Sequence, residues 1–391
     1  MAASARATVV IWESHTFIGG GQRISLTVAE ALAATAEVVF LVPGHGALTA
    51  RLDALGIEYY ETGSTETLLG ARSPRWKIGS LGGLIRSSLR GIGAIRRIRP
   101  TIIYAPGPKA LLQSAVCGAL LRLPVCWHVH HYFTSEGVAR LLRLVSRWSS
   151  VRRVIAVSRS AGERVVAANA RHKLEVLCNP VDCVRFDGER VESSALSDAL
   201  AELTTHEIVL GQVAAIENVK NQMVCLQVAE ELLAMGRDTV LVLVGGLKGK
   251  EGEGYLASLL ERIEGGPLHG KAHYLGERDD VERILPYLTF LLVPSLEGCP
   301  LAALEANASG VPVVAIDRAG TTELFADGMA GALFEPDEPR QAAQRINDLC
   351  DSPSDYRDLC ESGRIFALGH SEVQYKRRVS QTVLGAAGRR P

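Results

Sequence analysis

The sequence of 391 residues is poor in aromatic residues and has no long uninterrupted apolar run. Aromatic side chains make up 5% of the chain, and methionine occurs only four times. The longest apolar stretch, 110–126, is interrupted by Gln113, Arg122 and Pro124, so no membrane-spanning helix is expected there. No basic segment with an apolar core precedes the first apolar run, Thr8–Trp12, and we therefore expect no secretory signal.

Zinc motifs are also missing. The eight cysteines include no Cys-x-x-Cys pair and no spacing typical of a zinc site. They are therefore predicted to be reduced residues of a cytoplasmic protein. The 47% of apolar residues excludes low-complexity disorder, and the length suits two folded domains.

The formal net charge of −1 hides a large difference between the two halves of the chain. Residues 1–190 carry +11 and residues 191–391 carry −12, and no acidic residue occurs between Glu66 and Glu136. This asymmetry indicates two domains, of which the first meets an anionic partner. Nucleic acid is not expected, because no zinc finger, helix-turn-helix or aromatic-interleaved basic motif is present. A membrane surface or a phosphate-bearing substrate fits the charge better.

Short apolar runs alternate with amphipathic segments along most of the chain. Such runs, buried on both faces and separated by helices, indicate parallel sheets built from βαβ units. The chain is thus predicted to form two doubly wound α/β domains, with a linker between about Asn179 and Thr205. Ligands of such sheets bind at the carboxyl ends of the strands. The expected strands are Thr8–Trp12, Val38–Val42, Thr101–Tyr104, Val125–Val129, Val154–Val157 and Glu175–Cys178 in the first half, and Ile208–Val213, Val240–Val244, Ala272–Leu275, Phe290–Val293 and Val313–Ala315 in the second.

The most informative segment, Pro294–Ala306, follows one of these strands. Pro300 suits the first position of a helix, because its missing N–H would have no acceptor there. The positive end of that helix favours a pyrophosphate ligand. Glu297 precedes the helix and Glu305 lies within it, so the two carboxylates are expected to flank the phosphates. The alternative is one solvated glutamate and one that only favours the helix dipole.

This segment is similar to the donor-binding half of the retaining family 4 glycosyltransferases, which have the GT-B fold. Glu297 and Glu305 form the E-x7-E pattern, and the resemblance extends over essentially the whole chain. It implies two Rossmann-like domains facing a central cleft. Residues 1–190 would bind the acceptor, residues 191–370 the nucleotide-sugar donor, and 371–391 would form a helix that returns to the first domain. The other segments that carry the resemblance are the Gly19–Gly21 loop, Val157–Ser158, Asn179–Asp182, 306–315, Ala319–Glu323 and Asp327–Pro336.

The resemblance also implies roles for individual residues. Glu297 would hydrogen-bond the transferred sugar, Glu305 would hold the ribose, and Lys220 would reach the diphosphate. His130 would line the donor sugar, as a catalytic-site residue together with Glu297 and Lys220. The remaining donor-binding residues implied are Gly20 and Gly21, Gln212 in the loop that carries Lys220, the diphosphate loop Gly298, Cys299, Pro300 and Leu301, and the nucleobase segment Tyr274, Leu275, Glu277 and Arg278.

Gln212 departs from the family pattern. The family usually has arginine at this place, after the first strand of the second domain, whereas the Lys-Asn-Gln context of Lys220 is kept. A neutral amide cannot neutralise a leaving diphosphate as a guanidinium does. Another basic residue would have to act there, the leaving group would be stabilised less well, or the chain would be a noncatalytic relative.

A metal cofactor is not expected. His128 and His130 point to one face of their strand and form a conceivable metal pair, but no Asp, Glu or Cys ligand is evident nearby. We interpret His128 as a core histidine. The resemblance requires no metal if the helix dipole, the loop amides and Lys220 hold the diphosphate.

The basic segment 78–98 has two interpretations. Its isoleucines and leucines recur at helical spacing with arginines between them, which is typical of a helix that covers a sheet and exposes a solvated face. The alternative is peripheral attachment to anionic lipid at the inner face of the cytoplasmic membrane. Many members of the resembling family use lipid-linked acceptors.

Together these patterns predict an enzyme that transfers a sugar from a nucleotide-diphosphate sugar to an acceptor hydroxyl with retention of anomeric configuration. The acceptor would be a cell-surface glycan, a lipid-linked sugar or a small molecule. Two alternatives remain open: a noncatalytic nucleotide-sugar-binding protein and a GT-B sugar-nucleotide 2-epimerase.

Overall fold

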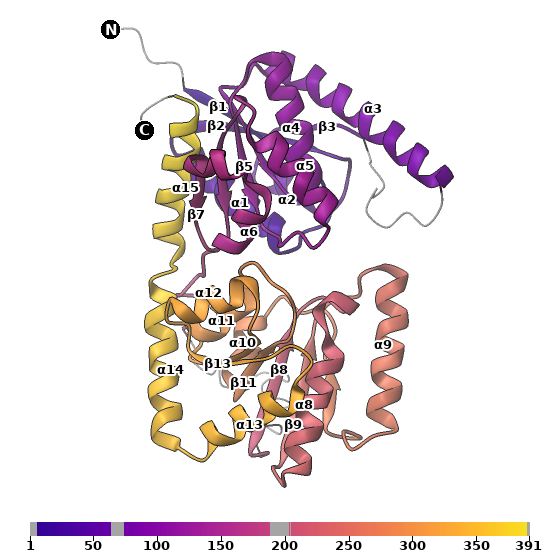
Figure 1. Ribbon diagram of the computed structural model, residues 1–391, viewed down its shortest axis with the longest axis vertical. Helices are drawn as coiled ribbons and strands as arrows, with labels where there is room; N and C mark the ends of the chain where they lie inside the picture. The colour runs from indigo at the N-terminus through magenta and orange to yellow at the C-terminus, as the bar shows by residue number, and fades with distance from the viewer. Residues whose placement is uncertain (1–5, 64–73, 188–202, 204, 389–391) are drawn as a thin grey trace. The chain divides into compact units, whose positions relative to one another are not determined.

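The computed structural model of the chain describes residues 6–63, 74–187, 203 and 205–388, with side chains of helix α3 from residue 83 onward. The chain divides into two compact units (Figure 1). The first comprises Met1–Cys178 together with Val373–Pro391, and the second comprises Asn179–Glu372. The boundary expected at 190, and most of the expected linker, lie outside the described residues.

The first unit is built on a seven-stranded parallel sheet of order β3-β2-β1-β4-β5-β6-β7. Winding proceeds outward in both directions from β1 and β4, so the carboxyl ends of these two strands form a topological switch point. The strands are β1 (Ala7–Trp12), β2 (Ala36–Val42), β3 (Tyr59–Glu61), β4 (Ile102–Pro106), β5 (Val125–Val129), β6 (Val151–Ala156) and β7 (Leu174–Val176).

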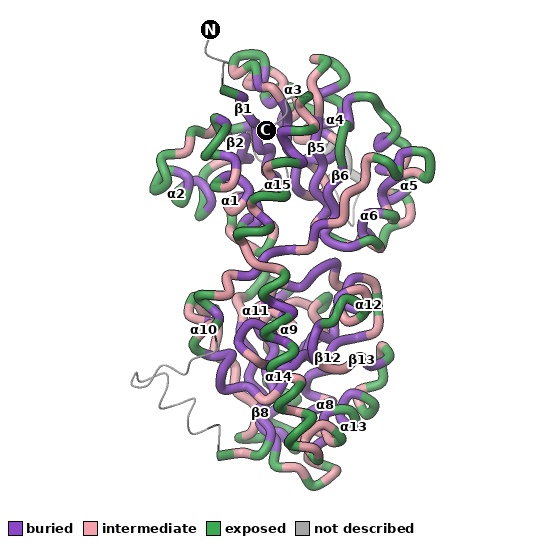
Figure 2. The backbone as a smooth tube through the Cα atoms, turned by 90° about the vertical axis from the view of Figure 1, so that its left-hand side faces the viewer, coloured by how far each residue is buried: buried purple, intermediate pink, exposed green. Residues whose placement is uncertain are grey.

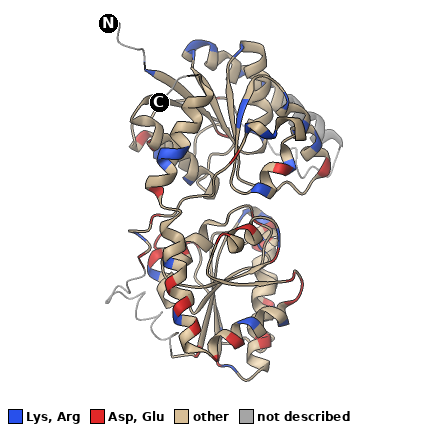
Figure 3. Cartoon of the chain, turned by 60° about the vertical axis from the view of Figure 1, so that its left-hand side comes forward, with Lys and Arg blue, Asp and Glu red and all other residues tan. Residues whose placement is uncertain are grey.

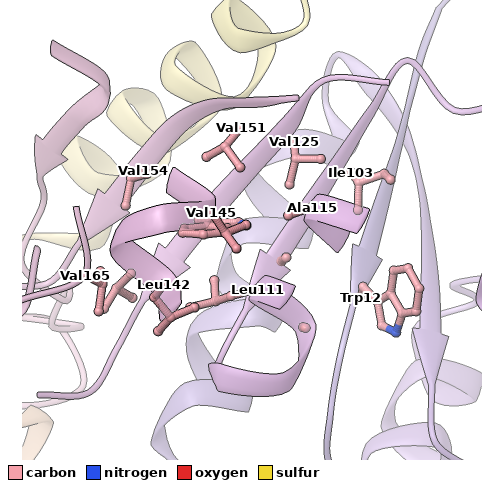
Figure 4. Close-up of a cluster of buried hydrophobic side chains, with 14 of the residues drawn as sticks. Trp12, Ile103, Leu111, Ala115, Val125, Leu142, Val145, Val151, Val154 and Val165 are labelled. Atoms are coloured by element: carbon pink, nitrogen blue, oxygen red, sulfur yellow. The ribbon is translucent and has the colours of Figure 1, made fainter. Parts of the chain in front are cut away.

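Alternate residues of these strands face opposite layers of helices. On β5, Val125, Trp127 and Val129 belong to a buried cluster that also takes in side chains of α3 to α6 (Figure 4). The terminal helix α15 (Glu372–Ala386) packs beside α1, where Lys376 Nζ lies 3.0 Å from Glu30. The other helices are α1 (Gly20–Ala33), α2 (Ala47–Ala54), α3 (Pro74–Ile98), α4 (Pro108–Leu121), α5 (Glu136–Ser146) and α6 (Arg159–Val165), with a 3-10 turn at Ala168–Lys173.

The second unit repeats the design with six parallel strands in the order β10-β9-β8-β11-β12-β13. Its switch point lies between β8 and β11. The strands are β8 (Ile208–Val213), β9 (Thr239–Val244), β10 (Ala272–Tyr274), β11 (Phe290–Val293), β12 (Val313–Ile316) and β13 (Gly331–Phe334). The helices are α8 (Gln222–Ala234), α9 (Gly249–Glu264), α10 (Val281–Ile284), α11 (Leu301–Ala308), α12 (Ala319–Ala326), α13 (Pro339–Cys350) and α14 (Pro353–Leu368), with 3-10 turns at Asn218–Lys220 and Leu285–Tyr287.

Burial follows this layering in each unit. Strands β4, β5, β9, β11 and β12 are buried along their whole length, while the outer faces of the helices are exposed (Figure 2). Eleven strands lie within two or three residues of their expected bounds, and the predicted α/β fold is confirmed. Two short edge strands, β3 and β13, were not predicted, because a half-buried edge segment lacks the continuous apolar run of a central strand.

Two local expectations were wrong. Helix α11 begins at Leu301, and Pro300 occupies the preceding cap position with an extended ψ of 120°. Six of the eight cysteines are free, and Cys178 and Cys299 are not among them, so the expectation that all eight are reduced is wrong. In the described part of the chain, no helix has the length and apolar character needed to cross a bilayer.

Candidate functional site

Lys220 and Glu297 meet at the switch point of the second unit. Lys220 ends the short turn that follows β8, and Glu297 lies in the loop that follows β11. The Lys220 Nζ lies 2.5 Å from Glu297 Oε1, and Ser295 Oγ donates a second hydrogen bond of 2.9 Å to the same oxygen. Both charged side chains are about one quarter exposed. The site therefore offers a ligand one positive and one negative group at neighbouring positions.

The loop between Glu297 and helix α11 is held by its backbone. The Gly320 N–H donates to the Glu297 carbonyl at 3.1 Å, and the Asn179 side-chain amide donates to the Cys299 carbonyl at 2.8 Å. A Cβ on Gly320 would lie 1.6 Å from the Gly298 carbonyl oxygen, so only glycine permits this approach. At the start of α11 the Ala303 and Leu304 amides donate to the Pro300 carbonyl, whereas the amides of Leu301 and Ala302 precede the first acceptor that the helix provides. They form an anion-binding end.

Gln212 does not point into this site. Its side chain is 3% exposed, its Nε2 donates to the Lys220 carbonyl at 2.8 Å, and its Oε1 accepts from the Cys225 thiol at 3.3 Å. Both ends of the amide are thus used within the protein. Gln212 fixes the backbone of the turn that carries Lys220, and it reaches the site only through that residue.

The expected nucleobase segment lies at the neighbouring strand ends. Tyr274, the last residue of β10, donates its hydroxyl to the Gly245 carbonyl at 2.9 Å, and Leu275 continues the pairing with β9. Gly245 has a φ of 157°, and a Cβ there would lie 1.8 Å from the Ala214 carbonyl oxygen. The exposed Glu277 follows, beside Gly246. The loops after β8, β9 and β10 are therefore packed against one another through backbone contacts.

Two further donor-site candidates occupy defined positions. Arg278 forms a bidentate pair with Asp280, at 2.9 and 2.6 Å, and this guanidinium lowers the pKa of the Asp280 carboxyl. The Arg278 cation is therefore already neutralised by the protein. Glu305 lies half-buried in the second turn of α11, eight residues beyond Glu297.

A cavity of about 330 Å³ adjoins the Lys220–Glu297 pair. It is hollowed between the loops that follow β8, β11 and β13. Two of its lining residues, Asn221 and Asp337, have left-handed backbone conformations, with φ of 57° and 64°. The lining residues are Asn218, Val219, Asn221, Val224, Pro294, Ser295, Leu296, Ile316, Pro336 and Asp337.

The remaining candidates gather in the first unit. Gly20 and Gly21 begin α1, and a Cβ on Gly21 would lie 4.0 Å from Cδ2 of His130. The His130 ring stacks on His128 with centroids 3.9 Å apart. Both ring nitrogens of His130 are buried without a hydrogen-bond partner among the described residues. In contrast, His128 Nδ1 is hydrogen-bonded to the Tyr104 hydroxyl.

Burial keeps both imidazoles neutral. It lowers the pKa of His128 to about 3 and, with the adjacent His128 and His131, holds the pKa of His130 well below its ordinary value. In the described residues, no three His, Cys, Asp or Glu side chains converge as a metal site would require. Neutral rings beside a helix N-terminus suit the binding of hydroxyl groups.

The structure therefore brings the candidates together in two groups. Lys220, Glu297 and the start of α11 form one group in the second unit, and Gly20, Gly21 and His130 form the other in the first. Four supporting residues were not predicted: Ser295, Asn179, Gly245 and Gly320. Gly245 could have been noticed in the Gly-Gly pair after β9. Gly320 and Asn179 lie in segments that carry the resemblance, but their contacts, like that of Ser295, are not revealed by spacing.

Two family models match the chain. The model described as Glycosyltransferase Family 4 matches residues 18–185, and that described as Glycosyl transferases group 1 matches residues 198–366. The chain belongs to the family 4 glycosyltransferases of the GT-B superfamily. The Lys220–Glu297 pair thus lies within the segment matched by the group 1 model.

Curated members of the family align over parts of the chain. A UDP-Gal:alpha-D-GlcNAc-diphosphoundecaprenol alpha-1,3-galactosyltransferase of Escherichia coli is 24% identical, with 62% of this chain and 64% of that protein aligned. A D-inositol 3-phosphate glycosyltransferase of Nocardioides is 28% identical, with 52% of this chain and 47% of that protein aligned. These alignments span less than two thirds of each relative's own length.

Solved structures share the fold over nearly the whole chain. A structure of Anabaena HepE in complex with UDP and glucose has a TM-score of 0.79 at 20% identity, with 96% of this chain and 99% of that chain covered. WaaG, a glycosyltransferase involved in lipopolysaccharide biosynthesis, has a TM-score of 0.70 at 14% identity, with coverage of 96% and 100%. At this identity the likeness establishes the GT-B fold.

Proposed function

We propose that this family 4 glycosyltransferase transfers a sugar from a nucleotide-diphosphate sugar to an acceptor hydroxyl, with retention of anomeric configuration. The observation that supports it most is the Lys220–Glu297 pair, held across the switch point beside the N-terminus of α11. A cation and free helix amides suit a diphosphate, and a carboxylate suits sugar hydroxyls. Bound donor would exchange the Lys220–Glu297 contact for one contact with each side chain.

The chemical step needs stabilisation of the departing diphosphate. Lys220 and the first amides of α11 would act on this charge as preorganised groups. These groups carry the proposed reaction without a metal ion. Retention would follow if the acceptor attacks the face of the sugar from which the diphosphate leaves, with the phosphate oxygen taking the acceptor proton.

Gln212 bears on the noncatalytic alternative. Because its amide is occupied inside the fold, it does not replace the arginine of the family pattern as a diphosphate ligand. Lys220 is left as the cation of this loop. We favour a catalytic protein, because Gln212 bonds the carbonyl of Lys220 itself and so fixes that cation in place.

The acceptor is proposed from chemistry and from relatives. The E. coli relative is named for a sugar linked to diphosphoundecaprenol, and the Nocardioides relative for D-inositol 3-phosphate. Both acceptors carry phosphate, which agrees with the basic first half of this chain. We propose a phosphate-bearing acceptor of the lipid-linked kind, used in assembly of a cell-surface glycan or glycolipid at the cytoplasmic membrane.

Release of nucleotide diphosphate tests the proposal. The protein is incubated with uridine, guanosine and adenosine diphosphate sugars, with and without lipid-linked or phosphorylated sugar acceptors. A glycosyltransferase gives nucleotide release that rises with acceptor, and NMR of the product gives the same anomeric configuration as the donor. Release without acceptor would support the epimerase, and donor binding without release would support the noncatalytic protein.

A further inference from the structure

The outer layer of the first unit exposes an unusual amount of apolar surface. Helix α3 packs on α4, and α4 packs on α5, so that the three lie in sequence on one side of the sheet. Gln113 on α4 donates a hydrogen bond of 3.2 Å to Ser88 on α3, and Ser150, in the segment between α5 and β6, donates one of 3.2 Å to the Ala115 carbonyl of α4. We call their solvent-facing side the α3–α5 face.

Seven large apolar side chains are exposed on the α3–α5 face. Leu120 is 66% exposed, Leu89 63% and Leu144 59%, which are high values for leucines on helices that pack against a core. A sheet-covering helix needs only its inner stripe to be apolar, and here that stripe is supplied by residues such as Ile95, Leu111 and Leu142. The seven are Ile85, Leu89, Val116, Leu120, Leu141, Leu144 and Trp148.

Positive charge accompanies this apolar surface. In the described range 83–150 the only acidic residue is Glu136. Hydrogen bonds from Arg143, and then from Arg140, lower its pKa to about 2, so it adds no unpaired negative charge. Basic residues are visible along these helices in Figure 3. The exposed arginines are Arg86, Arg90, Arg96 and Arg97 on α3, Arg99 directly after it, Arg122 after α4, and Arg140 and Arg147 on or beside α5.

We propose that the α3–α5 face docks on a membrane surface that contains anionic lipid. Exposed leucines between arginines, with a tryptophan at the end, are the composition of a surface that lies in the lipid headgroup region. The arginines pair with lipid phosphates while the apolar side chains enter the headgroup–acyl boundary. A second copy of this chain fits less well, because two such faces carry the same charge.

This placement extends the earlier expectation for the basic segment 78–98. The first helix alone would give a charged attachment, whereas α4 and α5 add Leu120, Leu144 and Trp148, which can enter the lipid. The membrane-docking proposal rests on the proposed function in one respect: docking would bring the protein to a lipid-linked acceptor. Donor binding uses the second unit and is measured independently.

Vesicle binding of the full chain tests the proposal. Co-sedimentation is measured with phosphatidylcholine vesicles, with and without phosphatidylglycerol. The triple variant Leu120→Ser, Leu144→Ser, Trp148→Ser and the triple variant Arg86→Gln, Arg122→Gln, Arg147→Gln are compared with wild type. We expect binding that requires phosphatidylglycerol and weakens at high salt, and that falls by about tenfold or more in each variant.

A matched control removes three apolar side chains of the second unit that are, in rank order, at least as exposed as the three removed from the α3–α5 face. Val184→Ser, Ile365→Ser and Leu368→Ser replace residues that are 87%, 63% and 59% exposed, and we expect unchanged vesicle binding. Thermal unfolding of every variant, with and without nucleotide sugar, shows that fold and donor site are intact. Vesicle binding that is absent, equal in wild type and both triple variants, or lost in the control would overturn the proposal, as would binding of RNA or DNA in place of vesicles.

Tryptophan fluorescence gives a second readout. Of the four tryptophans, Trp12 and Trp127 are buried and Trp148 is 40% exposed. Trp76 is replaced by phenylalanine in every protein compared, so that Trp148 reports contact with lipid. We expect the emission of the Trp76→Phe protein to shift to shorter wavelength when phosphatidylglycerol vesicles are added, and that shift to be smaller when Trp148→Phe is added. An equal shift in Trp148→Phe would place the contact elsewhere.

Discussion

The ammonium of Lys220 lies 2.5 Å from the carboxylate of Glu297, although 77 residues separate them in the chain. The contact joins the two loops that flank the switch point of the second unit, where a doubly wound sheet opens its ligand crevice. It keeps both charges at the start of α11 in the absence of a ligand. A donor that binds there would separate them.

Removal of the Lys220 charge should affect turnover far more than stability. For Lys220→Met we expect kcat to fall roughly 10²–10³-fold, because a positioned group that stabilises the leaving charge is lost. Partly exposed ion pairs contribute little to folding, so the unfolding free energy should change by less than about 1 kcal/mol. Steady-state kinetics and urea unfolding measure the two effects. A variant with normal kcat would contradict the assignment.

Gln212 provides a test of the departure from the family pattern. Gln212→Leu leaves the Lys220 carbonyl and the Cys225 thiol without their partner, and should cost about 1–2 kcal/mol of stability and lower turnover. Gln212→Arg restores the residue usual in the family, but it places a charge in a buried position. We expect a loss of about 3 kcal/mol or more and no gain in activity. An Arg variant that is stable and more active would show that position 212 faces the donor.

Gly320 on α12 lies against the Gly298 carbonyl, so a substitution at Gly320 should disturb the loop that is proposed to bind the diphosphate. Gly320→Ala must displace the Gly298 carbonyl, and overpacking of this kind costs about 1–3 kcal/mol. Donor affinity should fall as well. The control is Gly254→Ala on α9, where a Cβ meets nothing within 4 Å. Because alanine is more favourable than glycine inside a helix, the unfolding free energy of Gly254→Ala should rise by about 0.5–1 kcal/mol, and its donor affinity should be unchanged. Equal effects of the two substitutions on donor binding would contradict the packing argument.

Substitution of His130 should lower turnover without lowering the stability of the fold. Its two buried nitrogens have no partner among the described residues, so His130→Phe should keep or raise stability by up to about 1 kcal/mol while turnover falls. His128→Phe is the contrast, because it removes the partner of the buried Tyr104 hydroxyl and should cost about 1–3 kcal/mol. Loss of stability in His130→Phe at neutral pH would show that the ring serves the fold.

The pH dependence of the same variants follows from the lowered pKa. The unfolded imidazole titrates near 6.5, and the folded one titrates far below it. Between these values the unfolded state binds more protons, so stability is complete above about pH 6.5 and declines as the pH falls below it. His130→Phe lacks this decline. The stability difference between variant and wild type should therefore grow in favour of the variant at acid pH, as followed by urea unfolding.

The sequence was sufficient for the two sheets and for the residues at the ends of their strands. Central strands such as β5 and β8 were predicted with their bounds, because burial on both faces leaves an unbroken apolar run. Lys220, Glu297 and Glu305 came from a resemblance in motif, and the structure adds the contact between the first two. Gln212 was expected among the donor-binding residues, and the sequence pattern does not reveal that its side chain bonds the Lys220 carbonyl and the Cys225 thiol.

The supporting contacts could not be predicted either, because they depend on how segments pack in the folded structure. Ser295 acts through a hydrogen bond to Glu297, and Gly320 through backbone contact with a loop more than twenty residues earlier. Exposure on the α3–α5 face was equally hidden. Leu120 and Leu144 have the periodicity of helices, but only the packed structure shows that these leucines lie outside the core.

Titration with nucleotide sugars, followed by thermal unfolding, is the most direct measurement of donor binding. Uridine, guanosine and adenosine diphosphate sugars are compared on wild type and on Glu305→Ala. At one hundred times the dissociation constant a ligand adds about 2.7 kcal/mol of stability, which is readily detected. We expect a shift with one base that is lost in Glu305→Ala. No shift with any nucleotide sugar, or an equal shift in the variant, would contradict a donor site at α11.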